Sequence, residues 1–96
     1  MTLNITADIL ARAERNSKKK GPIALAAREE LSEYNIQKLS VAYNGVINVL
    51  TPINRVVYTP IAQDENKVFR FINDWDSGED VEPIVLNYKK LGTFPL

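Results

Sequence analysis

The 96-residue chain contains no cysteine and no histidine. Without cysteine it can form no disulfide and no thiolate metal site, and without histidine it lacks the commonest general acid–base group and a usual zinc ligand. A secreted domain of this size would normally need disulfides, so the composition favours a reducing compartment, the cytoplasm. We therefore expect a protein that is not an enzyme and that holds no metal and no cofactor.

Long apolar runs and clustered glycines are also absent. No stretch approaches the roughly 20 apolar residues that span a bilayer, and residues 1–10 lack the basic and apolar regions of a signal peptide. The four glycines stand singly, so the sequence contains no glycine-rich phosphate loop. These absences predict a soluble protein that has no membrane partner and no nucleotide site of the common type.

The composition is that of a small globular domain. Apolar residues make up 45% of the chain, which is enough for one modest core, and we expect a single domain over residues 1–96 that folds alone or as a homodimer. Twelve basic and twelve acidic residues cancel, so local patches rather than the net charge would select a partner.

The first third of the sequence predicts a helical hairpin. Residues 6–16 are rich in strong helix formers, and the Thr6 hydroxyl can cap the first amides. Gly21-Pro22 predicts the start of a second helix, because the missing proline N–H would be unpaired in a first turn anyway. The apolar residues of that helix recur at helical spacing: Ile23, Ala27, Leu31 and Tyr34.

The segment 37–50 predicts a β-hairpin that turns at Asn44-Gly45. Asn-Gly between β-branched runs is a strong hairpin signal, because the two-residue turn that favours it requires positive φ at both residues. A helix is the alternative, since apolar residues in this segment also fit a heptad: Ile36, Leu39, Tyr43, Val46 and Leu50. We favour the hairpin, because a helix here would be loaded with Val and Ile and would hold a glycine in its middle.

The last part of the sequence predicts a third strand, a helix and a fourth strand. Residues 53–59 form the strand, bracketed by Pro52 and Pro60. Asp64 can cap a helix that ends at Gly78, with an apolar stripe of Val68, Phe71, Ile72 and Trp75. Residues 83–88 suit the fourth strand, and residues 89–96 form a tail that packs only through Leu91 and Phe94. The order ααβββαβ predicts an α+β fold, an N-terminal helical hairpin followed by a small, mostly antiparallel sheet with one further helix.

One acidic segment stands out between residues 74 and 82. It resembles a calcium loop, but a loop that begins at Asp74 would place Gly78 at the fifth position instead of the required sixth, so a calcium site is not predicted. We interpret the segment as an acidic patch that binds the basic surface of a larger protein partner. The candidate partner-binding residues are Asp74, Asp76, Glu79, Asp80 and Glu82.

One basic segment stands out between residues 12 and 20. Cations near a helix end are favoured by the helix dipole, and as a functional site they would contact phosphates. DNA reading by the second helix is not expected, because residues 23–27 open it with apolar side chains. The candidate nucleic-acid-binding residues are Arg12, Arg15, Lys18, Lys19 and Lys20, and together with the acidic segment they predict two poles of opposite charge.

Two functions follow from these patterns, and a carboxylate-based enzyme ranks third after them. The first is a non-enzymatic protein-binding module, a small inhibitor or accessory factor of the kind that phages and other mobile elements encode, acting on a host protein. The alternative is a nucleic-acid-associated accessory protein or transcriptional regulator that uses the basic turn at residues 12–20.

Overall fold

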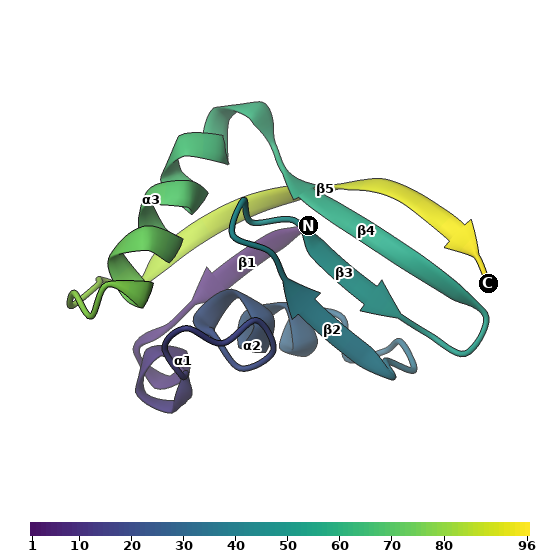
Figure 1. Cartoon of the computed structure of the whole chain (residues 1–96), viewed down its shortest axis with the longest axis horizontal. Helices are drawn as coiled ribbons and strands as arrows, with labels where there is room; N and C mark the ends of the chain where they lie inside the picture. The colour runs from purple at the N-terminus through teal and green to yellow at the C-terminus, as the bar shows by residue number, and fades with distance from the viewer.

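The computed structural model describes all 96 residues and has the α+β architecture that the sequence predicts (Figure 1). The elements are β1 (Thr2–Ile5), α1 (Ala7–Arg12), α2 (Pro22–Glu30), β2 (Lys38–Val41), β3 (Ile47–Leu50), β4 (Asn54–Pro60), a short 3₁₀ helix η1 (Ala62–Asp64), α3 (Glu65–Asp76) and β5 (Ile84–Pro95). The five strands form one sheet in the order β1-β5-β4-β3-β2, and every neighbouring pair is antiparallel. The sheet therefore has one strand more than predicted.

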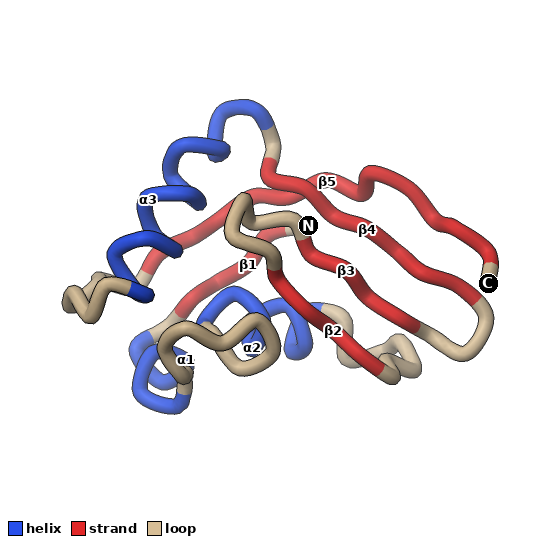
Figure 2. The backbone as a smooth tube through the Cα atoms, viewed as in Figure 1, coloured by secondary structure: helices blue, strands red, loops and turns tan.

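The core lies on one face of this sheet. Residues two apart along a strand share a face, and alternate residues of all five strands enter a single apolar cluster with side chains of α2 and α3. Leu3, Leu39 and Ile47 are fully buried there. The helices gather at one end of the molecule, while β2 to β5 extend away from them toward the C-terminus (Figure 2).

The N-terminal strand β1 was not predicted. It alternates exposed and buried residues over only four positions, with Leu3 and Ile5 inward, and this is too short a pattern to identify alone. Its partner is β5, which pairs Leu3 with Leu86. Thr6 follows directly and caps α1 as expected, since its hydroxyl accepts a hydrogen bond from the Ile9 N–H.

Helix α1 ends at Arg12 and not at residue 16. Ala13 is already extended, and residues 14–20 form a connection that bonds to α3 instead of continuing the helix. Helix propensity alone cannot reveal this, because the competing bonds come from residues about 60 positions away. The start of α2 at Pro22 agrees with the prediction.

The tail predicted for residues 89–96 is wrong, because β5 continues to Pro95. Residues 88–95 pair with β4, and the register shifts where Val57 faces Gly92 and Tyr58 faces Lys90, so that Leu91 is an extra residue in a β-bulge. Glycine, proline and a bulge obscure the alternating pattern of this half of the strand. Residues 88–95 form a strand because they hydrogen-bond to β4.

The β2–β3 hairpin is confirmed, but its turn is of another type. Gly45 has φ +87°, whereas Asn44 does not have a positive φ. The Gly45 N–H donates to the Ala42 carbonyl and the Ala42 N–H donates to the Val46 carbonyl, which is the pattern of a three-residue loop with glycine in the left-handed position. The Gly45 carbonyl accepts from the buried Tyr88 hydroxyl at 2.8 Å, so the loop is fixed to β5.

Helix α3 begins after Asp64, but the side chain of Asp64 does not cap it. Its carboxylate instead accepts two hydrogen bonds from Asn87 of β5, from the backbone N–H at 2.8 Å and the side-chain amide at 3.2 Å. The last residue of the helix is Asp76, and Gly78 stops it as predicted. Gly78 has φ +87°, its N–H donates to the Trp75 carbonyl, and the Glu79 N–H donates to the Asp74 carbonyl, which together make a Schellman motif.

The two left-handed glycines allow a matched test of the hairpin packing. A Cβ at Gly45 would lie 2.5 Å from Val68 Cγ1, whereas a Cβ at Gly78 would meet nothing within 4 Å. We expect Gly78→Ala to lower the free energy of unfolding by about 1 kcal/mol through backbone strain alone. Gly45→Ala should lower it by a further ~1–3 kcal/mol through overpacking. Urea unfolding of both variants measures the difference, and equal losses would contradict the packing seen at Gly45.

Candidate functional site

Trp75 is the residue on which the candidate site is built. It lies in the last turn of α3 and is only 7% exposed. Its indole N–H donates to the Glu14 carbonyl at 3.0 Å, and the Arg15 guanidinium lies 4.1 Å from the ring centroid. The indole therefore fixes the α1–α2 connection to α3 through a hydrogen bond and a cation–π contact.

Two residues of the α1–α2 connection, Arg15 and Asn16, form further hydrogen bonds to the end of α3. Arg15 Nη1 donates to the carbonyls of Trp75 and Glu79, which places a cation at the carboxyl end of α3, where the helix dipole favours it. The Asn16 N–H donates to the Asp76 carboxylate at 2.9 Å, and the Asn16 side chain donates to the Asp76 carbonyl at 3.2 Å. The basic and acidic segments are thus in contact, and the prediction of two separate poles is wrong.

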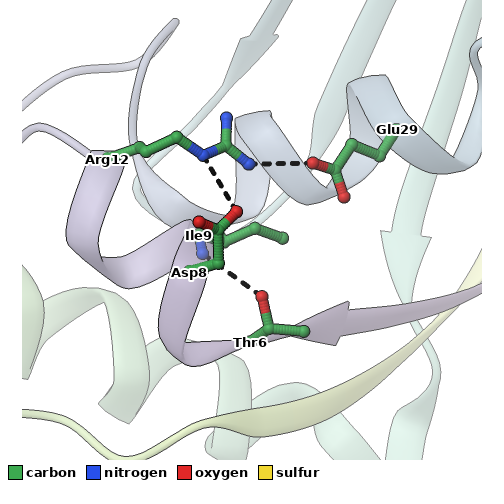
Figure 3. Close-up of polar contacts among 5 residues, drawn as sticks. All are labelled: Thr6, Asp8, Ile9, Arg12 and Glu29. Atoms are coloured by element: carbon green, nitrogen blue, oxygen red, sulfur yellow. Dashed lines mark hydrogen bonds and ion pairs between the residues drawn. The ribbon is translucent and has the colours of Figure 1, made fainter.

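Most of the predicted basic residues are engaged within the chain. Arg12 forms ion pairs with Glu29 at 2.9 Å and with Asp8 at 3.1 Å (Figure 3), and these hydrogen bonds, that with Glu29 first, raise the pKa of Arg12 above its ordinary value. Lys20 lies 3.7 Å from Glu14. Lys18 and Lys19 form no ion pair, and the Lys18 ammonium lies 5.2 Å from the Tyr43 ring centroid.

The predicted acidic residues divide differently. Asp76 is used within the chain, since its carboxylate holds Asn16. Asp74, Glu79, Asp80 and Glu82 form no ion pair, and the last three are exposed. The Schellman motif at Gly78 gives this acidic turn a defined backbone at the end of α3. Four carboxylates without an ion pair therefore lie in the last turn of α3 and in the residues that follow it, next to Trp75 in the sequence.

A pocket of about 210 Å³ opens next to this turn. The α1–α2 connection, the first turn of α2, the end of β2 and the last turns of α3 form its walls. Its apolar lining includes Pro22, Ile23, Val41, Phe71, Ile72 and Trp75, and polar lining residues include Asn16, Ser17, Lys18 and Asp76. Because the apolar lining comes from three separate segments, α2, β2 and α3, only the folded chain brings it together.

Sequence patterns did not reveal this pocket. Ile23, Phe71 and Trp75 fit the apolar stripes of two helices, and this is also the pattern of core residues. The one weak signal was an aromatic residue, Tyr43, in the predicted hairpin turn, and in the structure Tyr43 and Lys18 both line the pocket. The lining contains no histidine or cysteine, and no group of three potential metal ligands occurs anywhere in the chain. The geometry is that of a binding site with an apolar interior and a charged rim.

Comparison with protein-family models, with curated proteins and with solved structures finds no match to this chain. No helix combines the length and apolar composition required to cross a membrane. Function must therefore be inferred from the chain's own geometry.

The contacts of Arg15 should make a measurable contribution to stability. Arg15→Ala removes two hydrogen bonds to the end of α3 and the cation–π contact, and we expect a loss of about 1–2 kcal/mol in the free energy of unfolding. Lys19→Ala is the control, because Lys19 is exposed and has no ion pair, and it should change stability by less than about 0.5 kcal/mol. Chemical denaturation gives both values. Similar values for the two variants would show that the connection is not held to α3 in the way described.

Proposed function

We propose that this chain is a non-enzymatic, cytoplasmic protein-binding module, a small inhibitor or accessory factor that occupies a surface of a larger partner. Its binding surface consists of the pocket beside Trp75 and the acidic turn formed by Asp74, Glu79, Asp80 and Glu82. The observation that carries the proposal is the combination of an open apolar pocket with adjacent carboxylates that have no partner within the chain.

Each part of this surface has a separate physical role. A pocket of about 210 Å³ can take one aliphatic or aromatic side chain of the partner, and burying such a side chain contributes about 1.5–3 kcal/mol. Anchors of this type commonly dominate the energy of a protein interface. The carboxylates complement basic residues around the anchor, which speeds encounter and selects among partners more than it adds affinity.

The same contacts give less support to the nucleic-acid alternative. Phosphate binding depends on cations that are free to neutralise the backbone. Arg12 and Lys20 are in ion pairs and Arg15 is bound to the end of α3, which leaves Lys18 and Lys19 as the unpaired cations of the basic segment. The contacts of Arg12, Arg15 and Lys20 within the chain support a structural role for most of the basic segment.

Charge reversal of the acidic turn tests the proposal. The triple variant Glu79→Lys, Asp80→Lys and Glu82→Lys should fold normally, because exposed charges contribute little to stability. Asp76 is left unchanged, since its carboxylate holds Asn16. The partner is captured from source cells by affinity, and its association rate is then measured with each protein. We expect the triple variant to associate on the order of tenfold more slowly than the wild type, and the wild-type rate to fall with added salt.

A charge-matched control and a variant of the pocket make the result specific. Reversal of Glu30, Glu33 and Glu65 to lysine changes the net charge by the same amount at exposed positions with no ion pair, and it should retain binding. Ala42→Phe at the pocket wall should block the anchor and speed dissociation. Association that survives the acidic reversal but is lost with Lys18→Glu and Lys19→Glu would favour the nucleic-acid alternative and contradict the proposal.

A further inference from the structure

The face of the sheet opposite the core is covered by no helix. Register partners lie on the same face, and one row of partners crosses four strands: Lys38 of β2, Leu50 of β3, Arg55 of β4 and Phe94 of β5. None of the four belongs to the apolar core cluster. This outer face is therefore defined by alternation along the strands. Lys38, Arg55 and Phe94 are exposed on it, whereas Val57 at its centre is buried.

The charge on the outer face has a single sign. Three basic residues lie on it: Lys38, Arg55 and Lys89. Lys89 belongs to this face because it pairs with Thr59, which is four residues from Arg55 along β4 and therefore on the same side of the sheet. Residues 34–63 and 83–96 contain no aspartate or glutamate, so no strand from β2 to β5 carries an acid. All twelve acidic residues lie elsewhere, in helices and their connections. The outer face is thus basic in a chain whose net charge is zero.

Apolar side chains are exposed at the same place. Phe94 is 43% exposed, and its ring packs over Gly92 while the Arg55 guanidinium lies 5.2 Å from the ring centroid. Ile53 and Leu96 lie just beyond the row, are about three-quarters exposed and are joined by the Leu96 N–H donating to the Ile53 carbonyl. Exposed apolar side chains that lie near one another and beside cations are typical of an interaction surface.

The second half of β5 extends beyond β1 and therefore has one unpaired edge, which offers a poorer site than this face. The bulge at Leu91, the two lysines at 89 and 90 and the proline at 95 are devices that block the addition of another strand. At this end of β5, the available contacts are therefore those of side chains on the face, and not a backbone ladder.

We propose that the outer face around Arg55 and Phe94 binds a protein segment rich in acidic and apolar side chains. Carboxylates of the segment pair with Lys38, Arg55 and Lys89, and its apolar side chains cover Phe94 and Ile53. Ser40, Asn48 and Thr59 lie in the same plane as these residues. Inserting that plane into lipid would bury hydroxyl and amide groups without partners, whereas a protein segment can hydrogen-bond them. A second copy would bring two acid-free faces together.

Peptide selection tests this surface and does not require the natural partner. A random peptide library displayed on phage is selected on the full chain, and each enriched peptide is measured against the double variant Arg55→Glu, Phe94→Ala. We expect enriched peptides to combine Asp or Glu with aliphatic or aromatic residues, and to bind the variant at least about tenfold more weakly. The matched control is Arg70→Glu, Phe69→Ala, which changes an exposed arginine and an exposed phenylalanine on α3 and should retain binding.

The outcomes separate this surface from its alternatives. Selection of no peptide sensitive to the outer-face variant, or of sensitive peptides that are basic, would overturn the proposal. Two other results would also overturn it. Sedimentation with phosphatidylserine vesicles that is lost in the outer-face variant would assign the face to membranes. Dimerisation in ultracentrifugation that is lost in this variant would assign the face to a second copy. Because the acidic turn is unchanged in these variants, the result is independent of the function proposed above.

Discussion

The contact of Trp75 with the α1–α2 connection is the interaction on which the candidate site depends. The indole N–H bonds the Glu14 carbonyl and the Arg15 guanidinium covers the ring, so that the connection without regular structure runs along the end of α3. This path gives the pocket one of its walls and places Arg15 against the last carbonyls of the helix. Two further contacts continue this wall, since Asn16 bonds to Asp76 and the Val41 N–H donates to the Lys18 carbonyl.

The sequence separation between contacting residues explains which parts of the structure could be predicted. Local signals identified the Thr6 cap, the start of α2 at Pro22, the β2–β3 hairpin and the end of α3 at Gly78, because each depends on residues a few positions apart. Elements that depend on distant partners were missed. Strand β1 is short and needs β5, and the second half of β5 carries a bulge and needs β4.

The candidate site shows the same division. Composition located the acidic and basic segments correctly in the sequence but not in space, since bonds between Asn16 and Asp76 join them across 60 residues. Asp76 and Arg15 are individually plausible surface charges, and only the fold shows that they hold two segments together. The acidic residues of this segment that form no ion pair are Asp74, Glu79, Asp80 and Glu82, a subset that no sequence pattern distinguishes from Asp76.

Hydrogen exchange in the presence of the captured partner shows directly whether the partner binds at the pocket and the acidic turn. Protection of backbone amides should increase at residues 16–24, 41–43 and 71–82, the segments that form the pocket and the turn. Amides of β1 should exchange at unchanged rates, because this strand contributes nothing to the pocket lining. Protection confined to residues outside the pocket and the turn would contradict the account.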